Sequence, residues 1–126
     1  QTIRYSAQPG DMQPVHFSSI GKAILAQMDD ERCTAWLAAN PLERQAPKMN
    51  INARQLQREL KATRASGYCV AGGETAKDVM AVAVAIPSRG DPMGVAIAGP
   101  NSRIKPAARR HGELLLRLRK EIADRG

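Results

Sequence analysis

The chain contains few aromatic residues and no long apolar run. One Phe, two Tyr and one Trp are the whole aromatic set in 126 residues, too few to supply the platforms on which nucleic-acid bases stack. No apolar segment approaches the ~20 residues of a membrane span, and no charged and apolar regions mark a signal peptide. We therefore expect no membrane association and a cytoplasmic protein.

Cysteine and histidine are equally scarce. Cys33 and Cys69 stand alone without C-x-x-C spacing, so two buried thiols in a reducing compartment are favoured over a disulfide or redox pair. His16 and His111 share no metal-ligand spacing with any thiol or carboxylate pair. The sequence therefore predicts neither a metal site nor a cofactor, and catalytic residues are not expected.

The chain carries a net charge of +7, which suggests contact with nucleic-acid phosphates. The basic residues are, however, dispersed over three segments, at 54–64, 103–110 and 117–120. A solvated basic surface is therefore favoured over a DNA-binding groove. A basic nucleic-acid-binding module remains one alternative function.

The order of predicted elements indicates an α+β domain. The length suits one domain spanning residues 1–126. Periodicity, caps and turn signals predict strands at 2–6, 13–17, 68–70, 79–86 and 93–98, with helices at 18 or 19–28, 31–39 and 50 or 52–66. Strands and helices are segregated along the chain, which is typical of an antiparallel sheet with helices packed on it.

The last predicted helix opens at Lys105-Pro106, because proline is favoured in the first turn of a helix. Its apolar residues recur at helical spacing and predict one buried stripe formed by Ala107, His111, Leu114, Leu115, Leu118 and Ile122. Two caps are also predicted: Asp29 or Asp30 begins the second helix, and Gly67 ends the third.

The segment from Val15 to Leu25 has the pattern of a strand that passes directly into a helix. The first amides of a helix have no partner within it, so those of Ser19, Ile20 and Gly21 could hold a carboxylate or phosphate. The alternative is an ordinary capped helix in which Gly21 only permits close packing.

Three motifs together resemble the C-terminal effector-binding domain of the IclR family of bacterial transcription regulators. They are SSIGKAIL at 18–25, GY at 67–68 with the following Glu74, and GPNSRI at 99–104. The resemblance implies a GAF/profilin-like fold and a role in sensing a small organic-acid effector. It also implies a homodimer or homotetramer, with DNA bound only through an N-terminal winged helix-turn-helix domain that precedes this segment.

The resemblance assigns the effector-binding residues position by position. They are the helix-start residues named above and, on the strands, Ala71, Val79, Ala81, Ala96 and Ala98. Family members that bind small oxo-acids have an Asp, a Cys and two Ser where this chain has its four alanines. A polar acid would leave oxygens unpaired there, so an aromatic or largely apolar carboxylate is expected. The alternative is that small residues only allow close packing, without a ligand.

Glu74 is the remaining candidate, either as a gate over the ligand or as an ion-pair partner of Lys22 or Lys77. A different class of function would be a small cytosolic enzyme that uses Cys69 or His16 together with Glu74. No second catalytic motif accompanies these residues. A binding domain without enzyme activity is therefore the favoured interpretation.

Overall fold

A computed structural model describes residues 19–40, 53–72, 78–87, 89 and 92–125. Within these ranges three strands form one antiparallel sheet in the order β1-β2-β3. The strands are β1 (Cys69–Gly72), β2 (Val79–Ile86) and β3 (Met93–Pro100). This arrangement confirms the α+β fold and the predicted antiparallel return of the third strand.

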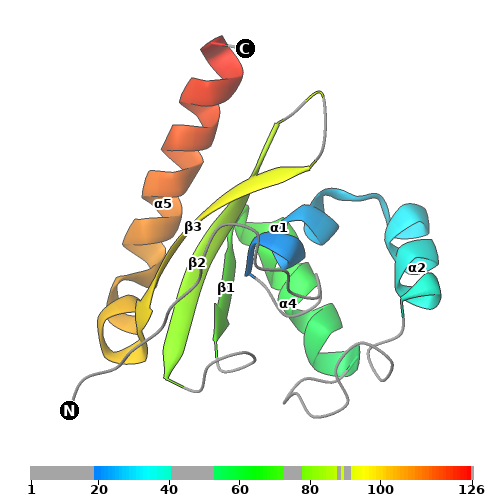
Figure 1. Cartoon of the computed structure of the whole chain (residues 1–126), viewed down its shortest axis with the longest axis horizontal. Coiled ribbons are helices and arrows are strands. Elements are labelled where there is room, and N and C mark those ends of the chain that lie inside the picture. Colours follow the sequence, from blue (N-terminus) through cyan, green and yellow to red (C-terminus); the bar gives the residue numbers. More distant parts are fainter. Residues whose placement is uncertain (1–18, 41–52, 73–77, 88, 90–91, 126) are drawn as a thin grey trace, which may run out of the picture.

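Four helices cover the two faces of this sheet in the described part of the chain (Figure 1). The long helix α5 (Asn101–Arg125) packs on one face. On the other face lies α1 (Ser19–Gln27), backed by α4 (Ala53–Ser66), with α2 (Asp30–Ala39) beyond them. The sheet is therefore the middle layer; on its second face α1 contacts all three strands, and α4 contacts β1.

The two sheet faces differ in side-chain size because alternate residues of a strand point to opposite sides. The α5 face carries branched and long side chains, Met80, Val82, Val84, Ile86, Val95 and Ile97, which pack with Ile104 and Leu115. The α1 face carries small ones, among them Cys69, Ala71, Ala83, Ala85 and Ala96. Such a face allows α1 to lie close to the sheet.

Local signals set the predicted helix ends. Asp29 is the N-cap of α2, and its Oδ1 accepts a hydrogen bond of 2.7 Å from the Arg32 amide. Gly67 follows α4 with a φ of +92°, and its amide donates to the Thr63 carbonyl. This is the left-handed residue expected after a helix, so the prediction of a glycine cap is confirmed.

The predicted start of the last helix is wrong by one turn. The helix begins at Asn101, directly after β3, and Pro106 lies inside it. Proline at this place removes the bond that its amide would have made to the carbonyl of Ser102, in the exposed first turn. The helix nevertheless continues through it, so proline did not mark the helix boundary.

The predicted buried stripe on α5 is also largely wrong. Of its six members only Leu115 is buried, whereas Leu114, Leu118 and Ile122 are exposed by 51%, 39% and 38%. A helix of 25 residues is about 37 Å long, against about 27 Å for an eight-residue strand. The end of α5 projects past the sheet (Figure 1). Leu114, however, lies between buried Gly112 and buried Leu115, so its exposure comes from the rotation of the helix, whose buried face runs through Ile104, Gly112 and Leu115.

Other predictions are confirmed or fall outside the described residues. Cys33 and Cys69 are free and buried, as expected of structural thiols. The strands expected at 2–6 and 13–17 lie outside the described ranges, as do Ser18, His16 and Glu74. Across the described residues, no helix is long and apolar enough to cross a membrane.

Candidate functional site

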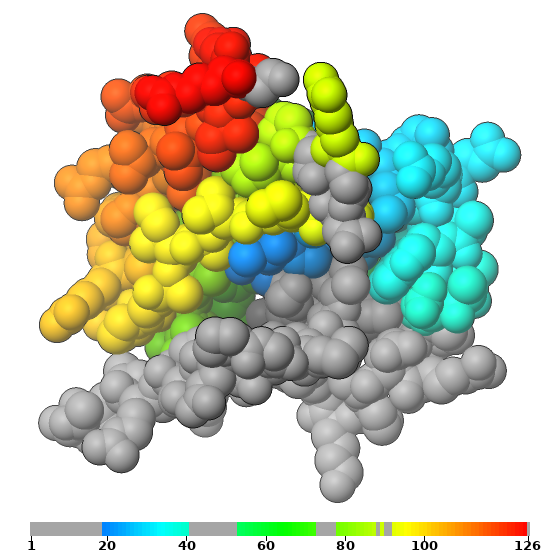
Figure 2. Space-filling view, turned by 45° about the horizontal axis from the view of Figure 1, so that its top comes forward, coloured from blue at the N-terminus to red at the C-terminus, as the bar shows by residue number. Residues whose placement is uncertain are grey.

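The start of α1 lies against β3. Ser19 is the first residue of the described helix, and both it and Ile20 are half-buried. A Cβ atom built on Gly94 would lie only 2.5 Å from Ile20 Cγ2, so the absence of a side chain at Gly94 makes room for Ile20. Figure 2 shows the beginning of α1 (blue) beside β3 (yellow) at the surface.

The strand candidates come together on the face that carries α1. Register pairs Ala71 with Ala81 and Ala81 with Ala98, which places these three residues in one row across the sheet. Ala96 belongs to the next row of this face, where it pairs with Ala83. The structure therefore gathers residues from three separate motifs into one patch of methyl groups, which we call the alanine patch (Ala71, Ala81, Ala96 and Ala98).

This alanine patch extends beyond the part of the sheet covered by α1. Ile20 contacts Gly94. Ala98 lies four positions further along β3, which corresponds to about 13 Å of strand. Along the same direction Ala81 is half-buried and Ala98 is exposed, whereas Ala83 is fully buried. The helix start and the row formed by Ala71, Ala81 and Ala98 are thus two ends of one region. Val79 continues this face and is half-buried.

The three helix-start candidates differ in their availability to a ligand. Gly21 is buried and already takes part in an interaction within the protein. The side chain of Ile20 packs with the core that contains Ala23 and Ala83. Ser19 and Ile20, which are half-buried, are therefore more accessible than Gly21, which is buried.

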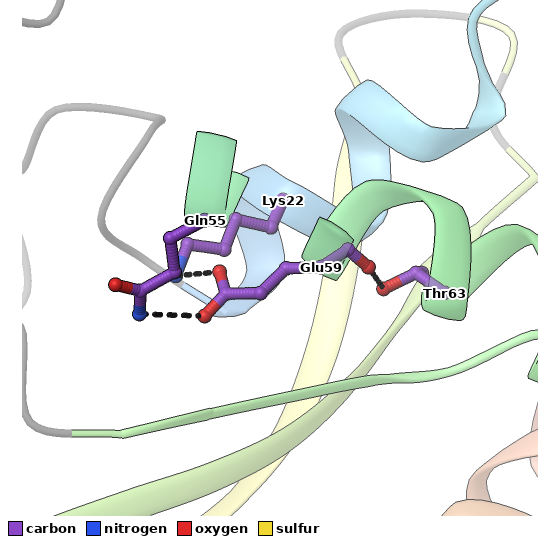
Figure 3. Close-up of polar contacts among 4 residues, drawn as sticks. All are labelled: Lys22, Gln55, Glu59 and Thr63. Atoms are coloured by element: carbon purple, nitrogen blue, oxygen red, sulfur yellow. Dashed lines mark hydrogen bonds and ion pairs between the residues drawn. The ribbon is translucent and has the colours of Figure 1, made fainter. Parts of the chain in front are cut away.

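A buried ion pair ties the first turn of α1 to α4 (Figure 3). Lys22 is completely buried, and its Nζ lies 2.5 Å from Glu59 Oε2. The other carboxylate oxygen of Glu59 accepts from the Gln55 amide at 3.4 Å, and the Glu59 carbonyl accepts from the Thr63 hydroxyl at 2.7 Å. This contact fixes the rotation of α1 and therefore the direction of its first amides.

Sequence reasoning missed the role of Lys22, which it considered only as an option for pairing with Glu74. The available signal was a lysine placed among apolar positions of a helix, because a buried ammonium group needs a partner. The partner itself, Glu59, lies 37 positions further along the chain on a helix whose charges were all expected to be solvated. Gly94, which makes room for Ile20, was also missed.

The described residues give little support to catalysis. Cys69 is fully buried within the core of the α1 face, so its thiol is out of reach of a substrate. His111 lies on α5, which packs on the opposite face of the sheet. Among the described residues no three His, Cys, Asp or Glu side chains could hold a metal ion together.

Comparison with known proteins agrees with this architecture. Residues 1–123 match the sequence profile described as bacterial transcriptional regulator IclR C-terminal. The transcriptional repressor IclR of Escherichia coli strain K12 is 30% identical over 123 residues, which are 95% of this chain and 45% of that protein. The chain spans less than half the length of the curated relatives it matches. These relatives are described as transcriptional or operon repressors.

Solved structures extend the comparison. The crystal structure of IclR from Thermotoga maritima superposes with a TM-score of 0.81 at 27% identity, over 99% of this chain and 52% of that one. The inducer-binding domain of a PobR double mutant from Acinetobacter, in complex with 3-hydroxybenzoic acid, gives 0.69 at 26% identity, over 89% and 68%. The chain therefore belongs to the IclR family of bacterial transcriptional regulators and corresponds to their C-terminal, effector-binding region.

Proposed function

We propose that residues 1–126 form a domain that binds an aromatic or largely apolar carboxylate and thereby modulates DNA binding by a longer regulator. The supporting observation is the patch of methyl groups that three strands present beside the start of α1. The carboxylate would meet the amides of Ser19 and Ile20, and the apolar body would lie over the alanine patch and Val79. DNA would be contacted only by an N-terminal domain outside this chain.

The chemistry of the region favours a ligand less polar than a small oxo-acid. An acid of two or three carbons consists mostly of oxygen-bearing groups, whereas the row formed by Ala71, Ala81 and Ala98 presents only methyl groups. Four methyl groups also offer no hydrogen bonds to keto or hydroxyl oxygens. The PobR domain, 26% identical to this chain, is described in complex with 3-hydroxybenzoic acid, which is consistent with an aromatic acid here.

Rough magnitudes agree with the same choice. Covering about 100 Å² of an aromatic ring contributes on the order of 2.5 kcal/mol, and one charge-assisted bond to an amide adds about 1.5–3 kcal/mol. A small oxo-acid would gain the second term only, and each oxygen left unpaired on the alanine patch would cost it about 1–3 kcal/mol.

Regulation then follows from a difference in affinity between two arrangements of the whole regulator. A ligand that binds one arrangement better shifts the equilibrium by that difference and by no more. We further propose a homodimer or homotetramer, because twofold assemblies match palindromic DNA sites. The exposed row Leu114, Leu118 and Ile122 on α5 supplies an apolar surface that such an assembly could bury.

Calorimetric titration with acids ranging from glyoxylate to substituted benzoates tests the proposal. We expect benzoates to bind more tightly than glyoxylate. Ser19→Pro should weaken benzoate binding about tenfold or more, because it removes one amide donor while proline is tolerated in a first turn. Ser19→Ala is the matched control, since it removes the hydroxyl but keeps the amide. Ile20→Pro is less suitable because it also removes a core side chain.

A second pair of variants examines the apolar end. Ala81→Ser or Ala98→Ser should weaken benzoate binding and strengthen glyoxylate binding, because each adds a hydroxyl to the alanine patch. If glyoxylate binds the unmodified chain most tightly, the argument from the four alanines is wrong. If Ser19→Ala and Ser19→Pro weaken binding equally, the amide is not the anchor.

A further inference from the structure

A second hollow lies at the opposite end of α1. It has a volume of about 460 Å³ and is bounded by the last turn of α1, the first turns of α2, the end of β2 and the start of β3. Its apolar walls consist of Ile24, Met28, Ala85, Ile86, Pro87, Pro92 and Met93. In Figure 1 this is the upper end of the sheet, between α5 on one side and α1 and α2 on the other.

Two arginines from different helices also line this hollow. Arg32 comes from α2, and Arg119 comes from α5 on the opposite face of the sheet. Arg32 is exposed and Arg119 is half-buried. Gln27 is the remaining described polar residue in the lining, which contains no described acidic side chain. The hollow therefore joins an apolar interior to two positive charges.

Two carboxylates at the start of α2, those of Asp29 and Asp30, already have other contacts. Asp29 Oδ1 accepts from the Arg32 backbone amide at 2.7 Å, and Asp30 lies 3.9 Å from the Arg64 guanidinium. Neither Arg32 nor Arg119 forms an ion pair with a carboxylate among residues 19–40, 53–72, 78–87, 89 and 92–125. Two arginines in one lining without such a partner favour the binding of an anion, since planar oxyanions match the paired donors of a guanidinium group.

We propose that this hollow binds an organic monoanion with a flat apolar body, at a site separate from the helix-start site. The lining residue of α1 nearest to the helix start is Ile24, one helical turn or about 6 Å along the axis from Ile20. The acidic group would lie between Arg32 and Arg119, with the ring against Ile24, Met28 and Ile86. A volume of this size is typical of pockets for small organic ligands. The inference does not depend on the proposed effector site.

The test uses a pair of fluorescent probes that differ only in charge. They are 8-anilinonaphthalene-1-sulfonate and N-phenyl-1-naphthylamine, which lacks the sulfonate. Titration of the 126-residue chain should give tighter binding of the sulfonate. Arg119→Met should weaken sulfonate binding about tenfold, because a half-buried charge-assisted contact is lost. Arg32→Met should weaken it about threefold, as expected for an exposed charge. Binding of the neutral probe should stay unchanged in both.

Matched controls separate this pocket from general effects. Arg110→Met removes the same charge from an exposed position of the same helix and should leave sulfonate binding unchanged. Ser19→Pro should also leave it unchanged, which distinguishes this site from the effector site. Equal losses in Arg110→Met and Arg119→Met would show a diffuse charge effect and overturn the proposal. Loss in Leu118→Gln but in neither Arg119→Met nor Arg32→Met would place the probe on the exposed surface of α5, with the same consequence.

Discussion

The buried pair of Lys22 and Glu59 provides the sharpest test of how α1 is held. Lys22 is completely buried, and Glu59 is exposed by only 18%. Replacing Lys22 by Met keeps most of the side-chain volume but leaves the Glu59 carboxylate without its cation in a largely dry place. Removing one partner of a buried pair typically costs about 3–5 kcal/mol, because the remaining charge stays desolvated.

The expected loss is large for a chain of this size. Domains are stable by about 5–15 kcal/mol, and near this length 1 kcal/mol changes the melting temperature by roughly 3–4 °C. We therefore expect Lys22→Met to lower the melting temperature by roughly 9–20 °C. Urea unfolding followed by circular dichroism gives the corresponding free energy directly.

The double variant identifies the cause. Lys22→Met with Glu59→Met removes both charges and should recover most of the stability, because an apolar pair of similar volume replaces the ion pair. Gln55→Ala is a mild control, since its contact with Glu59 is long at 3.4 Å. The single variants Lys22→Met and Glu59→Met are measured alongside it. If the double variant loses as much free energy of unfolding as the two single variants together, the two side chains are not coupled and the reasoning fails.

Four further outcomes are expected. Gly112→Ala should destabilise the chain by about 1–3 kcal/mol, although alanine has the better helix propensity, because the added Cβ would lie 2.6 Å from the Tyr68 ring. Thermal unfolding measures this loss, and adding Tyr68→Leu should restore part of the stability. Gly94→Ala should displace Ile20 and weaken benzoate binding in calorimetry. Asp29→Ala should cost about 1 kcal/mol in urea unfolding, because a helix cap is lost. Leu118→Glu should convert a dimer or tetramer into monomers at tens of micromolar by light scattering, and a monomeric unmodified chain would contradict the proposed assembly.

The described sheet and most helix ends were predictable because their causes are local. The apolar run Val79–Ile86 became the central strand with the predicted bounds, since it is bracketed by a polar residue and a proline. Asp29 and Gly67 ended helices through their own backbone and side-chain chemistry. Pro106 gave a wrong prediction of the helix start. Proline is favoured in the first turn of a helix, but here strand β3 leads directly into the helix at Asn101.

Features that depend on distant partners were not predictable in the same way. Leu114 and Leu118 fit a buried stripe by periodicity, but which face of α5 docks on the sheet depends on contacts with distant strands. The pocket with Arg32 and Arg119 joins residues 87 positions apart from opposite faces of the sheet. The choice of Ala71, Ala81 and Ala98 as candidate residues came from the family resemblance, and the strand register then places them in one row.

The small residues of the α1 face have a consequence for regulation. Methyl groups and one glycine give α1 a shallow surface, so specific contacts rather than deep interlocking must determine where the helix lies. Two such contacts are described: Ile20 over Gly94 and Lys22 with Glu59. A carboxylate at Ser19 and an anion beside Met28 would each add a contact at one end of the same nine-residue helix. Because both ligands would then act on one rigid element, each would alter the affinity of the other by the same factor.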